Sequence, residues 1–196
     1  DALLSSASTS LGAIVEVGSW LGAGTIPLAT GAQSSNQPVH AYDWWVASKD
    51  EVSKASAYGV PLSEGQDLLP VLEQNLGPLS KQVVFHKGDL RDAQWSEGEI
   101  GVYVDDAAKT KALFRKAIAT FGPFWRDGAA IFLMDYWYFQ KAGWRYAYQH
   151  RVLRRFKRYF DHLDIPITGK SSIQAFTYRI RDGGFRRWAL KLGKSV

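Results

Sequence analysis

The chain has 196 residues, 46% of them hydrophobic and 14% aromatic, which suits one compact domain with a full core and is too short for two ordinary domains. It contains no cysteine, which excludes disulfides and thiolate chemistry. The net charge of +5 is unevenly spread, because residues 1–140 hold 10 Lys and Arg against 16 Asp and Glu, whereas residues 141–196 hold 14 against 3. There is no signal peptide and no apolar run of membrane-spanning length, so we expect a cytoplasmic protein.

A short helix is expected at residues 3–9, and the segment after it, GAIVEVGSWLGAGT at 12–25, is the most informative in the chain. Its β-branched residues favour a buried parallel strand, and its glycines let backbone amides approach a ligand where the next helix, expected at 24–31, opens. Free amides there favour an anionic group, and a carboxylate at the strand end can accept hydrogen bonds from ribose. The pattern predicts a nucleotide-cofactor pocket, although similar turns occur in folds that bind nothing.

Acidic residues recur at the ends of the strands that follow. Strands are predicted at 39–43, 83–86, 100–105 and 129–134, and their ends carry Asp43, Asp89, Asp105 and Asp135. Each acid alone is also typical of a turn or a helix cap. Because ligands in open α/β sheets bind outside the carboxyl ends of the strands, the set together indicates a binding edge.

Other segments complete an alternation of strands and helices. A polar, partly helical insertion is expected at 49–78, with an amphipathic stretch at 67–76, and apolar periodicity predicts a helix over 107–121. A long basic helix is expected at 145–160, followed by a segment at 165–168 and a sheet-edge strand at 172–181. The order predicts a Rossmann-like α/β domain spanning the whole chain.

Two blocks carry a family resemblance that covers residues 11–181. The segments VEVGSWLGAGTIPLA at 15–29 and GVYVDDAAKTKALFRKAIATFGPFWRDGAAIFLMDY at 101–136 resemble class I S-adenosylmethionine-dependent methyltransferases, in the branch of macrocin-type sugar O-methyltransferases and cephalosporin hydroxylase-like proteins. The resemblance implies a mostly parallel seven-stranded sheet with helices on both faces, and methylation of a hydroxyl on a sugar or related small molecule. Such enzymes usually have a longer N-terminal segment, so we expect this chain to be a piece of a longer polypeptide.

The resemblance also implies a division of the site. The substrate side would involve Asp105 and Asp135, one of which would take the hydroxyl proton while oxygen, methyl and sulfur are held in line. Trp44 and Trp45 would flank the adenine or close the pocket, or else pack in the core. The cofactor's amino-acid end would lie at Glu16, Gly18, Ser19, Gly22 and Gly24, its ribose at Asp43, and its adenine at Asp89 and Leu90.

This chain departs from the family at the end of the fourth strand. Relatives commonly read Asp-Gly-x-His-x-Tyr, whereas residues 105–110 read DDAAKT, with Ala108 at the histidine position. Asp105, Asp106 and Asp135 are candidate ligands for Mg²⁺, which prefers oxygen ligands, but one expected ligand is missing because Tyr136 follows Asp135. Asp106 is equally suited to cap the next helix.

Some features of the sequence are compatible with other functions. The glycine turn also fits short-chain dehydrogenases, but no tyrosine is followed four residues later by the lysine that they need. A methyltransferase-like module without catalysis stays open, because the histidine motif is lost. We expect no specific nucleic-acid substrate, since the Asn/Asp-Pro-Pro-aromatic motif of base methyltransferases is missing after the fourth strand. His86 is expected to be a strand-end surface group.

The C-terminal part carries two ambiguous features. Its positive charge invites an acidic partner, such as a phosphorylated or nucleotide-linked sugar, an anionic membrane or nucleic acid. The segment RVLRRFKRYF at 151–160 is equally typical of a solvated helix that covers a sheet. The aromatic residues of 136–148 would form a substrate wall, a cover for the sheet edge, or an oligomer contact.

Overall fold

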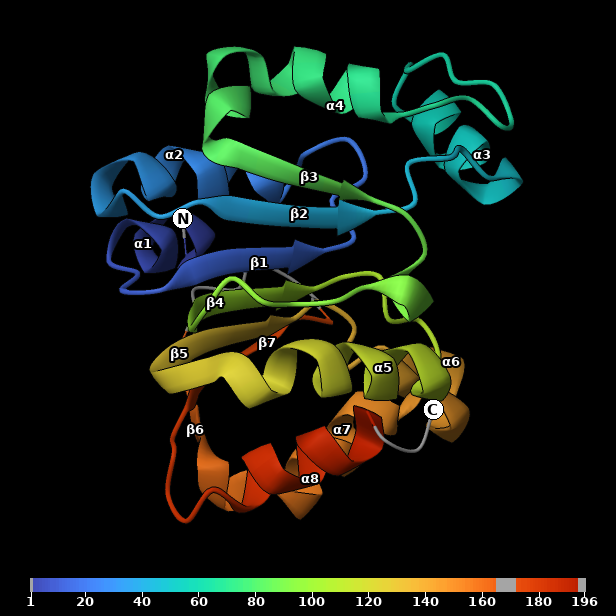
Figure 1. The fold of residues 1–196 in the computed structure, drawn as a ribbon. Helices are drawn as coiled ribbons and strands as arrows, with labels where there is room; N and C mark the ends of the chain where they lie inside the picture. The colour runs from blue at the N-terminus through green and yellow to red at the C-terminus, as the bar shows by residue number, and fades with distance from the viewer. Residues whose placement is uncertain (1, 165–171, 194–196) are drawn as a thin grey trace.

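The computed structural model describes residues 2–164 and 172–193, and a seven-stranded sheet in the order β3-β2-β1-β4-β5-β7-β6 forms its centre (Figure 1). The first five strands of this order run parallel, whereas β7 is antiparallel to both β5 and β6. The expected mostly parallel α/β sheet of seven strands is therefore confirmed. The strands are β1 Ala13–Val17, β2 Val39–Asp43, β3 Val83–Lys87, β4 Ile100–Asp105, β5 Trp125–Leu133, β6 Phe160–His162 and β7 Gln174–Tyr178.

Helices cover both faces of this sheet, as expected (Figure 1). One face packs against α1, α2 and α4, and the other packs against α5, α7 and α8. None of the helices in the described part of the chain is long and apolar enough to cross a membrane. The helices are α1 Ala2–Ser8, α2 Thr25–Ser35, α3 Lys49–Ala57, α4 Leu69–Leu76, α5 Lys111–Phe121, α6 Phe139–Ala142, α7 Tyr148–Arg155 and α8 Gly184–Gly193, with 3₁₀ turns at Gly77–Gln82, Leu90–Asp92, Gly122–Phe124, Trp144–Tyr146 and Lys157–Tyr159.

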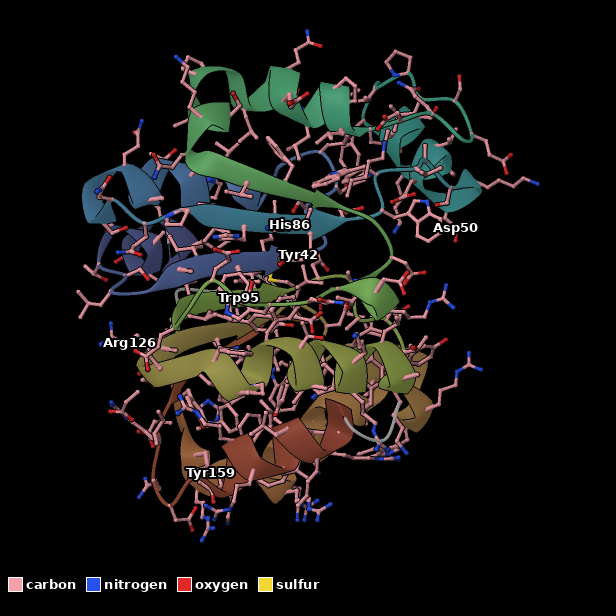
Figure 2. All side chains as sticks on the ribbon, in the orientation of Figure 1. Tyr42, Asp50, His86, Trp95, Arg126 and Tyr159 are labelled. Atoms are coloured by element: carbon pink, nitrogen blue, oxygen red, sulfur yellow. The ribbon has the colours of Figure 1, made fainter. Side chains whose placement is uncertain are left out.

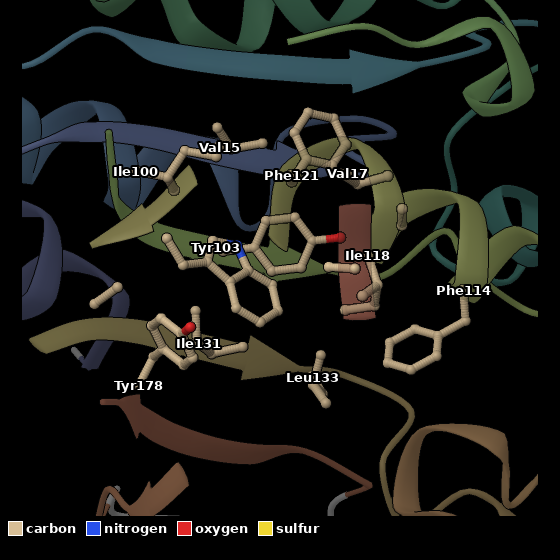
Figure 3. Packing of buried hydrophobic residues seen from close by; sticks show 14 of the residues in the cluster. Val15, Val17, Ile100, Tyr103, Phe114, Ile118, Phe121, Ile131, Leu133 and Tyr178 are labelled. Atoms are coloured by element: carbon tan, nitrogen blue, oxygen red, sulfur yellow. The ribbon is translucent and has the colours of Figure 1, made fainter. Parts of the chain in front are cut away.

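The pleat of the central strands divides the core into two clusters. In β4, Tyr103 points into one cluster, while its neighbours Val102 and Val104 point into the other. Figure 3 shows the first cluster, in which Tyr103 lies among side chains from β1, β5 and α5, including Phe121. Both faces of the inner strands are thus buried, which explains why their sequences are mostly apolar. This rigid double layer fixes the positions of the strand ends where the site lies.

The helices of the 48–76 region have clear local causes. Ser48 and Glu51 form a capping box in which each side chain hydrogen-bonds to the backbone N–H of the other, and this starts α3. Leu72 and Leu76 are the buried residues of α4, which lies within the amphipathic stretch predicted at 67–76. The partly helical insertion is therefore confirmed.

Two predicted boundaries were wrong. The helix expected from Ala107 begins only at Lys111, because Thr110 is its N-cap and accepts a hydrogen bond from the backbone N–H of Leu113. Asp106 therefore does not cap this helix. The strand expected at 129–134 begins four residues earlier, at Trp125, where it pairs with Ile100.

The long basic helix expected at 145–160 was also wrong. The chain there forms a 3₁₀ turn, the short helix α7, a second 3₁₀ turn and the edge strand β6. Tyr159 and Phe160 are buried against Phe185 of α8, and Phe160 pairs with Tyr178, so tertiary packing outweighs local helical periodicity. The strand predicted within 172–181 exists as β7, but it lies inside the sheet with β6 outside it. The segment predicted at 165–168 lies outside the described residues.

Candidate functional site

A cavity of about 1630 Å³ opens at the carboxyl ends of β1, β2 and β3. Its remaining wall comes from the loop after β4 and the first turns of α5. This is the edge where parallel sheets bind ligands. The residues that line it are Val17, Tyr42, Asp43, Trp44, His86, Lys87, Gly88, Asp89, Leu90, Arg91, Asp92, Ala93, Gln94, Ala107, Thr110, Lys111, Ala112, Leu113, Arg115 and Lys116.

Asp43 ends β2 at the wall of this cavity. Its Oδ2 accepts a hydrogen bond from the backbone N–H of Trp20 at 2.9 Å, and its Oδ1 accepts one from Trp45, also at 2.9 Å. Burial raises the pKa of this carboxyl, and these backbone donors oppose the rise. Each oxygen retains a lone pair for a further donor. The carboxylate is thus held in a fixed orientation without its accepting capacity being used up.

The two tryptophans after Asp43 have different environments. The Trp44 side chain is 53% exposed and lines the cavity, where its ring offers a flat apolar surface. Trp45 is fully buried, and its Nε1 donates to the backbone oxygen of Trp20. The core alternative therefore holds for Trp45, whereas Trp44 lies at the cavity and its contact with an adenine stays a prediction.

The glycine turn after β1 is packed too closely to admit side chains. Gly18 has φ +93°, and a Cβ there would lie 2.8 Å from the backbone nitrogen of Ala107. Gly22 has φ +98°, and its Cβ would meet Leu72 of α4 at 2.7 Å. A Cβ at Gly24 would collide with Glu16. The turn therefore lies tightly between the loop after β4 and the helices of the other face.

Glu16 is buried beneath this turn and lies outside the cavity wall. Its Oε2 accepts a hydrogen bond of 2.6 Å from the hydroxyl of Thr25, the first residue of α2. Burial raises the pKa of Glu16 to about 7. Ser19 is buried as well, and its hydroxyl, together with that of Thr25, opposes the rise in the pKa of Glu16. The glycine turn and Glu16 thus lie behind the residues of the cavity wall, whereas Asp43 faces the cavity.

On the third strand's side, Asp89 accepts hydrogen bonds from the backbone and the guanidinium of Arg91. The Arg91 side chain holds the pKa of Asp89 down, at about 2. Leu90, next to it, adds an apolar contact to the cavity wall. Both residues predicted at the adenine therefore lie in the cavity, but the Asp89 carboxylate is already paired.

His86 is not the plain surface group that the sequence indicated. Its ring stacks on Tyr42 with 4.1 Å between centroids, and its Nε2 lies 3.0 Å from Nδ1 of His40. Figure 2 shows Tyr42 and His86 side by side on β2 and β3. Burial lowers the pKa of both histidines, that of His40 to about 4. The stacked rings of Tyr42 and His86 form an aromatic part of the cavity wall, and His40 contacts His86.

The end of β4 is organised differently. Asp105 is fully buried, and its Oδ1 accepts a hydrogen bond from the backbone N–H of Ala108 at 3.0 Å. Its Oδ2 lies 3.3 Å from the hydroxyl of Tyr103, and burial raises its pKa to about 6. The hydroxyl of Tyr148 donates to the backbone oxygen of Ala108 from the opposite side. Both contacts hold Ala108, in the middle of the loop after β4.

An ammonium group lies between the other two predicted metal ligands. Nζ of Lys109 is 2.6 Å from Oδ1 of Asp106 and 2.5 Å from Oδ2 of Asp135. Burial lowers the pKa of Lys109, but the two carboxylates outweigh it, so the net pKa is raised. Within residues 2–164 and 172–193, no three His, Asp or Glu side chains are grouped as a metal site requires. These residues therefore do not fit the expected Mg²⁺ ion.

Aromatic side chains cover the sheet beyond Asp135. Tyr136 lies edge-on to Phe176 of β7, and its hydroxyl is 3.1 Å from Nδ1 of His150. Trp137 donates through Nε1 to Gln174, also of β7. These contacts pack Tyr136 and Trp137 against β7, the neighbour of the edge strand β6, and the substrate-wall and oligomer alternatives for this cluster stay predictions.

Sequence reasoning missed Lys109 and the His40–His86 pair. Lys109 follows Asp106 by three residues, which is the spacing of a local ion pair. The histidines could be found only with the strand register, which places Tyr42 beside His86. Of the predicted cofactor residues, the cavity collects Asp43, Trp44, Asp89 and Leu90 and leaves Glu16, Gly18, Ser19, Gly22 and Gly24 outside its wall.

Comparison with known proteins connects this chain to others through its structure. No family model and no curated protein sequence matches it. The solved structure of the O-methyltransferase NovP is similar with a TM-score of 0.64 and 12% identity, over 91% of this chain and 78% of NovP. The N-methyltransferase NodS from Bradyrhizobium japonicum WM9 is similar with a TM-score of 0.55 and 15% identity, over 91% of this chain and 94% of NodS. The CcbJ methyltransferase from Streptomyces caelestis is similar with a TM-score of 0.52 and 12% identity, over 91% of this chain and 87% of CcbJ. The chain therefore has the fold of class I methyltransferases.

Proposed function

We propose that this protein is an S-adenosylmethionine-dependent methyltransferase that acts on a hydroxyl of a small molecule. The observation that carries the proposal is Asp43, which ends β2 at a large cavity with accepting capacity left on both oxygens. A ribose presents two adjacent hydroxyls, and a fixed carboxylate at the end of the second strand can accept both. The methyltransferase fold supports the same assignment.

The cavity residues fit the rest of such a cofactor. Trp44 and Leu90 offer apolar surfaces for a flat base, and the Gly18 turn leaves backbone where a side chain would intrude on the loop after β4. When bound, S-adenosylmethionine supplies an electrophilic methyl group on a sulfonium. This chain's residues would hold it and align the acceptor, since alignment provides much of the acceleration in a displacement.

Asp135 is the better candidate for the base of the two predicted acids. Its side chain is 18% exposed, whereas Asp105 has no exposed surface and hydrogen-bonds to Ala108 and Tyr103. Asp135 would take the proton as the acceptor oxygen attacks the methyl group. Asp105 would be a positioning residue that holds the loop carrying Asp106 and Lys109. A hydroxyl must lose a proton during this reaction, which is why a carboxylate at this point favours an oxygen acceptor.

The acceptor that we propose is a sugar or a related molecule, and an anionic one fits the wall of the cavity. Lys111, Arg115 and Lys116 line it from α5, and none of them forms an ion pair with the described residues. Their charges would attract a phosphorylated or nucleotide-linked sugar.

A non-catalytic module is the second candidate, because Ala108 stands where relatives have histidine. Calorimetry with S-adenosylmethionine, S-adenosylhomocysteine and NADP tests cofactor binding, and mass spectrometry of the co-purified nucleotide identifies it independently. We expect the first two to bind and NADP not to bind. Transfer of radiolabelled methyl groups to a panel of free, phosphorylated and nucleotide-linked sugars then separates an enzyme from a binding module. Absence of binding by either sulfur nucleotide would contradict the assignment.

A further inference from the structure

Two carboxylates, one after β4 and one after β5, both contact the ammonium group of one lysine. Asp106 and Asp135 come from segments 29 residues apart in the chain, yet both carboxylates contact Nζ of Lys109. Two carboxylates within reach of one atom repel each other unless a cation lies between them. Lys109 supplies that cation from within the chain.

A divalent ion cannot share this position with Lys109. Mg²⁺ needs oxygen ligands at about 2.0–2.1 Å in an octahedral arrangement. The ammonium nitrogen already lies at hydrogen-bond distance from one oxygen of each carboxylate. Asp105, the remaining candidate ligand, is turned away into contacts with Ala108 and Tyr103.

One N–H bond of the Lys109 ammonium group is not used by the two carboxylates. An ammonium group carries three N–H bonds, and the two carboxylates account for two of them. The Lys109 side chain is 55% exposed, and its chain neighbours Ala107 and Thr110 line the cavity. Its backbone is held by a 2.7 Å hydrogen bond to Ala107, and the neighbouring Ala108 is held by Tyr148.

We infer that the Lys109 ammonium replaces the divalent cation of this site, holding Asp106 and Asp135 together and offering its third N–H to the acceptor oxygen, so that methyl transfer here is independent of metal. The part concerning the acceptor rests on the proposed function. In that step the acceptor oxygen bonds to the methyl carbon, the carbon–sulfur bond breaks with its electron pair left on sulfur, and the hydroxyl proton goes to Asp135. Lys109 thus contacts the acceptor directly and also offsets the negative charge of the two carboxylates.

The test uses Mn²⁺ as the probe, titrated into the protein and followed by electron paramagnetic resonance. Lys109→Ala should bind Mn²⁺ at least tenfold more tightly than the wild type, because it leaves two carboxylates without their cation. Lys109→Arg keeps the charge and should exclude Mn²⁺ as the wild type does. Lys111→Ala removes a nearby charge that contacts neither carboxylate, and its Mn²⁺ affinity should equal that of the wild type.

A double variant locates the ion. Adding Asp135→Asn to Lys109→Ala should abolish the gained affinity, and thermal unfolding shows whether each variant is folded. Equal Mn²⁺ affinity of the wild type and Lys109→Ala would overturn the inference, as would gained binding that survives the double change. Calorimetry with S-adenosylhomocysteine on the same preparations keeps the two proposals apart, because loss of that binding contradicts the proposed function without altering the Mn²⁺ comparison.

Discussion

The two halves of the binding edge manage charge in opposite ways. At β2, Asp43 lies beside an open cavity and accepts hydrogen bonds from backbone donors, so its carboxylate can still accept hydrogen bonds from a ligand. At β4 and β5, Asp106 and Asp135 are already neutralised by Lys109. The same residue type near the strand ends thus remains open to a ligand in one half and is internally paired in the other. What distinguishes the halves is the partner that each carboxylate meets.

Replacing Asp43 should have the largest effect. Asp43→Ala removes a charged acceptor of two ribose hydrogen bonds, and we expect S-adenosylhomocysteine affinity to fall about 30- to 1000-fold, or about 2–4 kcal/mol. Asp135→Ala, on the other half of the edge, should leave this affinity nearly unchanged. Calorimetry on both variants checks the contrast, and equal losses would mean that the two halves do not differ in this way.

A buried acid should make stability depend on pH. Burial raises the pKa of Glu16 from 4.5 to about 7, so the folded state binds the proton more tightly than the unfolded chain does. Glu16 therefore makes its full contribution to the free energy of unfolding below pH 4.5, and this contribution is lost as the pH rises through about 7. Between pH 4.5 and 7.5 we expect the free energy of unfolding of the wild type to fall by about 2–3 kcal/mol relative to that of Glu16→Gln.

Urea unfolding of the wild type and Glu16→Gln at several pH values measures this shift. Asp105→Asn offers a matched comparison from the other half of the edge, because the pKa of Asp105 is raised from 3.8 to about 6. Its shift should be complete at a lower pH than that of Glu16→Gln. Curves that stay parallel to the wild type at all pH values would show that neither acid is protonated on folding.

The contact between the two halves can be tested at Gly18. Gly18→Ala combines a strained positive φ with a Cβ 2.8 Å from the backbone of Asp106 and Ala107, and we expect a loss of about 2 kcal/mol of stability. Gly128→Ala has φ +79° but open space around the new Cβ, so it should cost about 1 kcal/mol. Denaturant unfolding compares them, and equal losses would show that the close approach adds no cost.

The smallest effect is expected on the basic surface beside α7. Changing Arg154, Arg155, Lys157 and Arg158 together to uncharged residues should weaken retention on heparin, phosphorylated sugars or anionic liposomes if this surface binds an anion. Any retention should fall steeply with salt, because exposed charges are screened within about 8 Å at physiological ionic strength. Equal, negligible retention of wild type and variant on all three would identify this charge as a solvated surface.

Much of the fold could be predicted because its signals are local. The β-branched run before Gly18 and the acid at the end of each parallel strand placed β1 to β5 and the binding edge with small errors. The region 145–160 could not be predicted in the same way. Its helical periodicity is real, but Phe160 gains more by pairing with Tyr178 and packing on Phe185 than by continuing a helix.

The sequence by itself determined the order of strands and helices as far as β5, the tight turn at Gly18 and the presence of carboxylates at the strand ends, because backbone sterics and hydrophobic period act within a few residues. Only the tertiary structure decided which carboxylates remain available. Asp105 and Glu16 are buried and hydrogen-bonded, Asp135 contacts Lys109 of the loop after β4, and Asp89 is paired with Arg91, whereas Asp43 lines the cavity with backbone donors as its partners. These differences depend on groups distant in the chain, whose approach is set by the packing of the whole sheet.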